Sequence, residues 1–267
     1  MTHPFFDLPT PLVIGHRGAA GEAPENTLAS FARGLADGAA ILESDVHLTR
    51  DGVPVLIHDD DVARVTDGSG RVADLALRDL QGLDAAYRFS RDGGRSHPER
   101  GRGHRIPTLQ EAFGAFPSTR LNLELKEDVP GMVERTVAVV ASADRLDLTL
   151  LTSADDVLMG RLRAHVVEIG VEPALGACTA DVAGFARSAA GGEPPPAGPM
   201  ALQIPPDFAG RPLVTRALVE HAHRHGVQVH VWTINEPAEM ARLLDLGVDG
   251  LVSDHPARVT ALLKSRR

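Results

Sequence analysis

The chain has 267 residues, a hydrophobic content of 43% and a mean hydropathy near zero, which predicts a folded domain with an apolar core and excludes a largely disordered protein. Its net charge of −9 makes it a poor partner for nucleic acid. It has no apolar run of the ~20 residues that a membrane helix needs, no N-terminal signal pattern and a single cysteine, Cys178. We therefore expect a cytoplasmic protein without disulfides or stable membrane insertion.

Short apolar runs alternate with amphipathic stretches almost to the end of the chain. Eight runs are predicted as parallel strands: Leu12–His16, Ala40–Asp45, Arg120–Lys126, Leu148–Ser153, Pro173–Cys178, Met200–Ile204, Gln228–Thr233 and Gly250–Asp254. Helical patterns lie between them: Thr27–Asp37, Leu109–Phe116, Met132–Ala143, Asp155–Ile169, Ala180–Ala189, Thr215–His225 and Pro237–Leu246. Eight strand–helix units in about 250 residues predict an α/β fold of the (β/α)8 TIM-barrel type.

The connection between Asp45 and His58 is too short for a crossover helix. Asp51-Gly52 stands between two apolar runs, which predicts a hairpin in which Val53–His58 returns antiparallel to the second strand. A two-residue turn would place Asp45 opposite His58, and a four-residue loop would place Glu43 there, whereas a three-residue loop would break the match. The spacing therefore predicts that His58 folds back onto Glu43 and Asp45.

The segment that follows, residues 60–105, is too long for an ordinary connection. It holds a short helical pattern, Leu77–Ala86, and a stretch rich in Arg, Gly and His, Arg88–Arg105. We expect a small insertion subdomain or lid within a single domain that spans residues 1–267. The arginines of this stretch either attract an anionic substrate or belong to a solvated loop.

Carboxylates gather where two of the predicted strands end. Side chains alternate along a strand, so Glu43 and Asp45 face one way, as do Asn122, Glu124 and Lys126 on a later strand. Barrel enzymes build their sites at these strand ends. Three carboxylates converging there would repel one another unless a divalent cation such as Mg²⁺ or Ca²⁺ neutralises them, or unless each pairs with a nearby Arg or Lys. We expect one bound divalent cation.

Two histidines flank this cluster in the predicted fold. His16 ends the first strand and His58 ends the hairpin return. Cleavage of a phosphodiester needs one group to activate the nucleophile and one to protonate the leaving oxygen, and imidazole suits both tasks. Arg17 and Lys126 can neutralise charge on the non-bridging phosphate oxygens. The alternatives are a surface ion pair for Arg17 and a pair with Glu124 for Lys126.

These residues resemble those of the glycerophosphodiester phosphodiesterase family, in that family's order and over nearly the whole chain. The motifs that carry the resemblance are His16-Arg17-Gly18 with Pro24-Glu25-Asn26-Thr27, Glu43-x-Asp45, His58-Asp59, Glu124-x-Lys126, Val231-Trp232-Thr233-Ile234-Asn235 and Gly247–Pro256. Each motif is weak alone, and the six in order are specific.

The resemblance implies a TIM barrel with an insertion after the His58 strand, and it implies roles for the site residues. These are a divalent cation held by Glu43, Asp45 and Glu124, acid and base at His16 and His58, and phosphate contacts from Arg17 and Lys126. Glu25 either orients Arg17 or caps the first helix, and Trp232 either walls the pocket or belongs to the core. His47 shares the face of Glu43 and is expected behind the site or in solvent.

The sequence departs from the family pattern at two places. Residues Asp61–Thr66 form a loose version of the usual stretch after His58, and Ser153-Ala154 replaces the more usual Ser-Phe. Both leave the expected metal ligands and histidines intact. Both could change the part of the pocket that receives the alcohol, so they bear on substrate choice.

The expected activity is hydrolysis of a small-molecule glycerophosphodiester, such as glycerophosphocholine, to glycerol 3-phosphate and an alcohol. The nucleophile is water or the substrate's own 2-hydroxyl, and either histidine serves as the base. Two alternatives remain. A lysophospholipase D would need an exposed apolar lip beside the pocket, and a barrel that binds phosphodiesters without cleaving them would lack a histidine or carboxylate. The sequence does not predict an oligomeric state.

Overall fold

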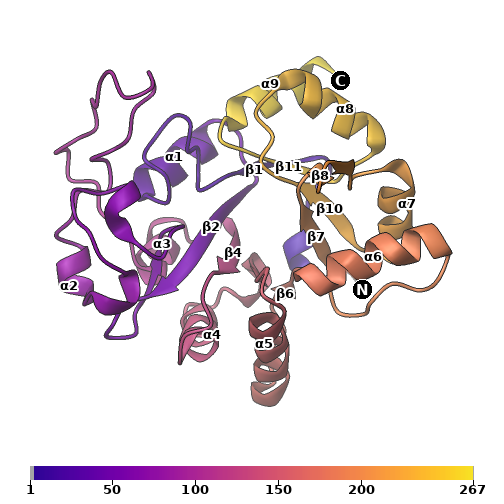
Figure 1. Ribbon diagram of the computed structural model, residues 1–267, viewed down its shortest axis with the longest axis horizontal. Helices are drawn as coiled ribbons and strands as arrows, with labels where there is room; N and C mark the ends of the chain where they lie inside the picture. Colours follow the sequence, from indigo (N-terminus) through magenta and orange to yellow (C-terminus); the bar gives the residue numbers. More distant parts are fainter. Residues whose placement is uncertain (1–2, 267) are drawn as a thin grey trace.

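The computed structural model describes residues 3–266, and within them eight parallel strands form a barrel that helices surround (Figure 1). The barrel strands are β1 (Leu12–Gly15), β2 (Ile41–Leu48), β4 (Arg120–Leu125), β5 (Thr149–Thr152), β6 (Ala174–Leu175), β7 (Ala201–Ile204), β10 (Gln228–Val231) and β11 (Gly250–Ser253). Their order in space is β6-β5-β4-β2-β1-β11-β10-β7, and a bridge between Gly176 and Ala201 joins the two ends. The (β/α)8 prediction and all eight strands are confirmed.

Helices follow the strands and cover the outer face of the barrel (Figure 1). They are α1 (Leu28–Ala36), α3 (Leu109–Ala115), α4 (Met132–Ser142), α5 (Asp156–Ile169), α6 (Thr179–Gly191), α7 (Arg216–Arg224), α8 (Pro237–Leu246) and α9 (Pro256–Ser265). The seven helices predicted between the barrel strands are confirmed within two residues at each end. The prediction omits α9, which packs against β1 and β11, although Pro256 at its first position is a helix-start signal. No helix among residues 3–266 is both long enough and apolar enough to cross a bilayer.

The interior of the barrel changes from apolar to polar along the strands. Its floor consists of apolar side chains from the strand starts, among them Leu12, Ile41 and Ala201. Phe5, from the short 3-10 helix η1 (Pro4–Phe6), is fully buried against this layer and plugs the floor. Alternate residues further along the same strands are polar, as in the step from Ile41 to Glu43. The polar end of the barrel is therefore its carboxyl-terminal mouth.

The predicted hairpin is present, but its loop length is not the predicted one. β3 (Pro54–Leu56) runs antiparallel to β2, with His47 opposite Val55. The backbone N–H of Thr49 donates to the Val53 carbonyl, which leaves a three-residue loop that ends at Gly52. Gly52 adopts a φ of 77°, the left-handed conformation that such a loop needs at its last position. The prediction of a two- or four-residue loop is therefore wrong.

His58 nevertheless reaches the barrel mouth, by a route that register alone does not give. Continued pairing would place it opposite Ser44, on the wrong face. Instead β3 ends at Leu56, and the Ile57 N–H donates to the Asp45 carbonyl at 3.1 Å before the chain leaves the sheet. The bend after this bond, rather than strand alternation, directs the His58 side chain toward the mouth.

The segment between β3 and α3 packs as a small unit against the hairpin. It contains the 3-10 helices η2 (Val62–Arg64) and η3 (Val72–Asp74) and the helix α2 (Leu77–Leu80), which is shorter than the predicted Leu77–Ala86. Its apolar cluster comprises Val55, Ile57, Val62, Val72, Leu80, Ala85 and Ile106. The arginines between residues 88 and 105 lie on exposed loop, where Arg100 stacks over the ring of Tyr87 at 4.0 Å.

A further hairpin follows β7 and was not predicted. Its strands are β8 (Asp207–Phe208) and β9 (Arg211–Pro212), and both are exposed. The Phe208 side chain is 68% exposed. Because this hairpin follows the carboxyl end of a barrel strand, it belongs to the same face of the barrel as the polar mouth.

Candidate active site

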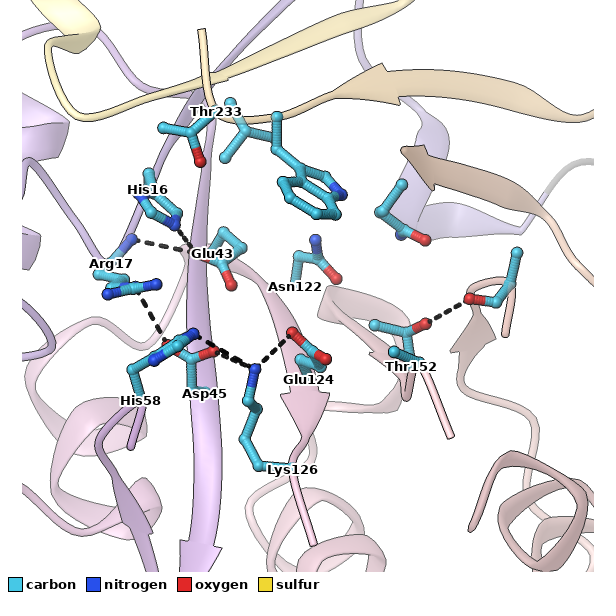
Figure 2. Close-up of a pocket in the computed structure, with 15 residues that line it drawn as sticks. His16, Arg17, Glu43, Asp45, His58, Asn122, Glu124, Lys126, Thr152 and Thr233 are labelled. Carbon is cyan, nitrogen blue, oxygen red and sulfur yellow. Dashed lines mark hydrogen bonds and ion pairs between the residues drawn. The ribbon is translucent and has the colours of Figure 1, made fainter. Parts of the chain in front are cut away.

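A cavity of about 240 Å³ lies at the mouth of the barrel. Among the residues that line it are eight of the predicted site residues: His16, Arg17, Glu43, Asp45, His58, Glu124, Lys126 and Trp232. Figure 2 shows the two histidines and Arg17 on one side of the acidic residues and Asn122 and Thr152 on the other. Residues that are far apart in sequence thus meet where the strands end, as the barrel prediction requires.

Three carboxylates converge in this cavity. Glu43 and Asp45 project from β2, and Glu124 from β4, where it pairs in register with Asp45. One oxygen from each lies within 4.8 Å of the others. Burial and the negative charge of Asp45 raise the pKa of Glu43 well above its ordinary value. An all-oxygen donor set of three crowded carboxylates, of which Asp45 is buried, fits a hard divalent cation such as Mg²⁺ or Ca²⁺.

Two basic side chains reach the same carboxylates. The Lys126 ammonium lies 3.1 Å from Glu124 and 3.5 Å from Asp45, and the Arg17 guanidinium lies 3.5 Å from Asp45. Burial alone would raise the pKa of Asp45, but these two cations outweigh burial and lower it. The predicted pairing of Lys126 with Glu124 is present. These two cations are fewer than the three carboxylates that they contact or adjoin.

The turn after β1 places Arg17 beside the acidic cluster. Arg17 has a φ of 47°, and Gly18 has a φ of 91°, a conformation that is costly for a residue with a side chain. A Cβ on Gly15 would lie 2.1 Å from the carbonyl oxygen of Gly18, so the turn folds too tightly for any other residue there. In this turn the Arg17 backbone N–H donates to Glu43 at 3.1 Å. The motif around His16 therefore fixes both a backbone donor and a guanidinium.

His16 is held from the barrel wall. Its Nδ1 donates to Asp254 at 2.6 Å, and its Nε2 lies 3.9 Å from Glu43. Burial opposes protonation of this imidazole, but the bond to Asp254 and the charge of Glu43 outweigh it and raise the pKa of His16. Asn235 donates to Asp254 at 2.6 Å and so fixes the carboxylate in turn. Asp254 was predicted only as a strand end, although it lies two residues after inward-facing Val252.

His58 is held mainly by residues that follow the hairpin. Its Nδ1 donates to Asp59 at 2.6 Å, and its Nε2 lies 3.4 Å from the Lys126 ammonium. His47, which is 1% exposed, donates from Nε2 to the His58 carbonyl at 3.0 Å. His47 thus lies behind the site, the first of the two predicted positions, and its burial excludes the solvent-exposed one. Its contact with His58 was not predicted.

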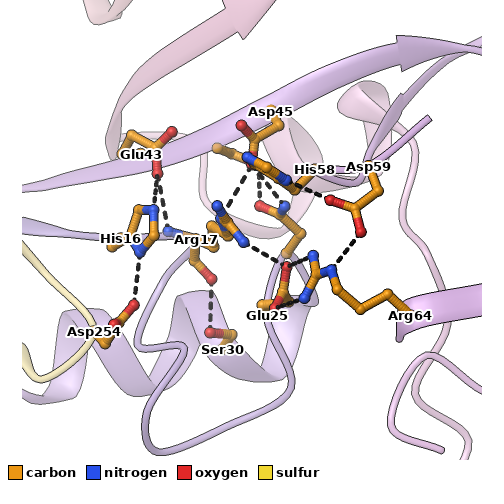
Figure 3. Close-up of polar contacts among 12 residues, drawn as sticks. His16, Arg17, Glu25, Ser30, Glu43, Asp45, His58, Asp59, Arg64 and Asp254 are labelled. Atoms are coloured by element: carbon orange, nitrogen blue, oxygen red, sulfur yellow. Dashed lines mark hydrogen bonds and ion pairs between the residues drawn. The ribbon is translucent and has the colours of Figure 1, made fainter. Parts of the chain in front are cut away.

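Glu25 lies beside the cavity rather than in its lining. It accepts from the Arg17 guanidinium at 2.9 Å, which agrees with an orienting position (Figure 3). The alternative, a helix cap, is wrong, because the Thr27 hydroxyl caps α1. Asn26 was not predicted as a site residue, yet its amide donates to Asp45 at 3.0 Å.

The remaining wall of the cavity comes from the other strands. Trp232 is 42% exposed and lines the cavity, so it does not belong to the core. Ala154 also lines the cavity, at one of the positions that depart from the family pattern. Asn122 and Gln203 contribute buried amide atoms that have no hydrogen-bond partner among residues 3–266. Gln203 was missed, although its place on the inward face of β7 could have indicated it.

The fold and this site together define a (β/α)8-barrel enzyme with an acidic, metal-type cluster between two histidines. The model of the glycerophosphoryl diester phosphodiesterase family matches residues 16–174 and 192–258. The chain is 30% identical to the glycerophosphodiester phosphodiesterase of Caldanaerobacter subterraneus subsp. tengcongensis, over 95% of this chain and 98% of that protein. The chain therefore belongs to the glycerophosphoryl diester phosphodiesterase family, and it is a phosphodiesterase.

Two further similarities bear on the substrate. The human lysophospholipase D GDPD1 is 28% identical over 94% of this chain and 85% of that protein. The solved structure of an Oleispira antarctica phosphodiesterase, in complex with the product sn-glycerol-3-phosphate, is 28% identical and superimposes with a TM-score of 0.73 over 96% of this chain and 97% of that one.

Proposed function

We propose that the protein hydrolyses glycerophosphodiesters, with glycerophosphocholine as a representative substrate, to glycerol 3-phosphate and an alcohol in a reaction that depends on a divalent cation. The relative from Caldanaerobacter and the product complex from Oleispira support this substrate class. Glu43, Asp45 and Glu124 would hold the cation. When bound, such a cation withdraws charge from a phosphate oxygen and orients the substrate.

The observation that carries the proposal is the arrangement of the two imidazoles. Each histidine uses Nδ1 to bond a carboxylate, Asp254 for His16 and Asp59 for His58. Each therefore directs Nε2 toward the acidic cluster, near Glu43 and Lys126 respectively. A phosphodiester between them would meet one Nε2 on the side of the nucleophile and one on the side of the leaving oxygen.

In this proposal the Nε2 atoms of the two histidines carry out the proton transfers, because each Nδ1 is bonded to a carboxylate. One Nε2 accepts the proton of the nucleophile, and the other donates a proton to the departing alkoxide. The carboxylate on each Nδ1 fixes the ring and stabilises the imidazolium while it exists. Water and the substrate's 2-hydroxyl are both suitable nucleophiles, because either is deprotonated by the same nitrogen. Attack by the 2-hydroxyl expels the alcohol and forms a cyclic phosphate, which a water molecule then opens to glycerol 3-phosphate.

The two cations at the site bind the phosphate in this proposal. The Arg17 guanidinium and the Lys126 ammonium both lie at the edge of the acidic cluster (Figure 2). Charge grows on the non-bridging oxygens as the nucleophile adds, and preorganised cations stabilise that charge more than they stabilise the ground state. Trp232 would form the wall against which the organic part of the substrate packs.

A lysophospholipase D activity is the second candidate, because three mammalian relatives carry that name and two aromatic side chains are exposed on this face of the barrel. Trp232 lines the cavity, and Phe208 lies on the hairpin that follows β7. Together they offer a place for one acyl chain. The two candidates share the catalytic centre and differ only in what lies beside it.

The test measures glycerol 3-phosphate released from glycerophosphocholine, and in parallel the choline released from lysophosphatidylcholine. We expect release that EDTA abolishes and that added Mg²⁺ or Ca²⁺ restores. Release that survives chelation would contradict the metal-dependent mechanism. Turnover of lysophosphatidylcholine without turnover of glycerophosphocholine would select the second candidate.

A further inference from the structure

Arg64 is the one arginine at the end of η2, and the local fold holds its backbone firmly. Asp61 accepts from the Ala63 N–H and caps the helix, and Val62 is fully buried in the apolar cluster of the insertion. The Arg64 side chain is 45% exposed, yet it points back toward the barrel mouth (Figure 3). The insertion therefore presents this guanidinium to the active site from outside the barrel.

The guanidinium of Arg64 contacts two carboxylates with three nitrogens. Its two terminal nitrogens donate to the two oxygens of Glu25 at 2.7 and 2.8 Å. Its Nε donates to Asp59. A planar fork that binds one carboxylate in this bidentate way fixes the orientation of the carboxylate as well as its position.

Each of these carboxylates also holds a residue of the proposed mechanism. Glu25 accepts from the Arg17 guanidinium at 2.9 Å, and Asp59 accepts from His58 Nδ1 at 2.6 Å. A continuous chain therefore runs from Arg17 through Glu25, Arg64 and Asp59 to His58 (Figure 3). Arg64 is its central member and touches neither end.

The charges along this chain require a cation at its centre. Without Arg64, Glu25 and Asp59 would have only Arg17 and His58 to satisfy them. Bonds to Arg64 and to their other partners outweigh burial, lower the pKa of Glu25 and bring the pKa of Asp59 to about 2. Both carboxylates thus stay ionised and keep accepting from the residues that they orient.

We propose that Arg64 is a positioning residue that orients the phosphate-binding Arg17 and the imidazole of His58 together, through Glu25 and Asp59. This inference rests on the proposed function, since it assigns no contact between Arg64 and substrate. The Arg64 side chain is 45% exposed, and ion pairs of exposed side chains contribute little to the free energy of unfolding. The network should therefore matter for turnover far more than for folding.

The primary test is Arg64→Ala with steady-state kinetics on glycerophosphocholine. We expect kcat to fall about 10- to 100-fold, as for the loss of an outer group that orients a catalytic one, with a smaller change in KM. The matched control is Arg78→Ala, because Arg78 lies in the same insertion, is 87% exposed and pairs with its neighbour Asp79 at 3.3 Å. That control should keep wild-type kinetics, and both variants should keep the wild-type melting temperature.

Two further measurements separate positioning from a merely structural role. Millimolar guanidinium should restore part of the kcat of Arg64→Ala, whereas methylammonium should not, because only the planar fork bonds both carboxylates. Arg64→Lys should stay well below wild type for the same reason. In addition, Arg64→Ala should cost little when it is added to a Glu25→Gln/Asp59→Asn variant, because the groups through which it acts are already lost.

The proposal is overturned if Arg64→Ala has wild-type kcat. It is also overturned if guanidinium does not restore kcat in Arg64→Ala and if Arg64→Ala lowers the kcat of the Glu25→Gln/Asp59→Asn variant as much as it lowers that of the wild type. A melting temperature lowered together with kcat would also overturn it, since the loss would then be structural. Failure of the proposed function is seen separately, as a wild-type protein that does not cleave glycerophosphocholine. An active wild type with an unimpaired Arg64→Ala variant removes only this inference.

Discussion

The two histidines at the mouth have the same chemistry and different supports. His16 ends a barrel strand, is 15% exposed and bonds Asp254, which stands at the end of β11. His58 follows a strand that has already left the barrel, is 32% exposed and bonds Asp59, which the insertion secures through Arg64. One imidazole is thus held by the closed sheet, and the other by a segment packed beside it.

This difference separates the part of the site that the fold fixes from the part that a connection can adjust. The His16 side is made of adjacent strands whose register leaves little freedom. The His58 side depends on a loop, a short 3-10 helix and a small apolar cluster. We infer that changes in the insertion alter catalysis through His58 while they leave His16 in place.

The largest effects are expected from removing the imidazoles themselves. His16→Ala and His58→Ala should each lower kcat/KM by about 10²- to 10⁴-fold, because each loses a proton-transfer group. The comparison predicts that added imidazole rescues His58→Ala more than His16→Ala, because the His58 position is more exposed. Equal rescue of the two variants would show that imidazole from solution reaches both histidine positions equally well. A variant with wild-type rate would remove that histidine from the mechanism.

The barrel-wall side also carries an acid-sensitive element. His230 on β10 is 1% exposed, and burial lowers its pKa from its ordinary value of 6.5 to about 4. As the pH falls, His230 takes up a proton in the unfolded chain before it does so in the folded protein. The contribution of neutral His230 to the free energy of unfolding is therefore complete above pH 6.5 and is lost progressively toward pH 4. The loss amounts to about 3 kcal/mol, since each unit corresponds to 1.36 kcal/mol.

The measurement is urea unfolding of wild type and His230→Asn at several pH values between 7 and 4. The variant should show a flatter decline in the free energy of unfolding, whatever its stability at pH 7. His97→Asn, in the arginine-rich loop of the insertion, is the control and should decline as wild type does. If the free energy of unfolding of His230→Asn fell with pH as steeply as that of the wild type, another group would cause the acid sensitivity.

The smallest effects are expected from substitutions that change only Asp254 or Asp59, the carboxylates that hold the two histidines. These substitutions compare the two supports most directly. Asp254→Asn should lower both activity and stability, since it disturbs a part-buried network that includes Asn235. We expect a loss of about 1–3 kcal/mol in the free energy of unfolding. Asp59→Asn should lower activity at a cost below about 1 kcal/mol, because its partners His58 and Arg64 are 32% and 45% exposed and water can reach the pairs. Equal losses of melting temperature in the two variants would contradict the comparison.

The parts of the site that follow from strand alternation could be predicted from the sequence. Glu43, Asp45 and Glu124 share a face because side chains alternate, and the barrel brings their strands together. The contacts that hold the site could not be found in this way. Asp254 bonds a histidine that is 238 residues away, and the bend that carries His58 inward belongs to no periodic pattern. Local sequence indicates which face a residue takes, and it does not indicate its distant partners.

Phe5 closes the base of the barrel, and the cavity lies at the opposite, carboxyl-terminal end. In the proposed reaction a phosphodiester enters from that end with one of its two ester substituents leading, and both fragments depart through the same opening. Bulk on the trailing alcohol can then remain outside while the phosphate reaches the histidines. A cavity that is closed at its base selects substrates by the substituent that enters first, and the fragment bound deepest leaves last.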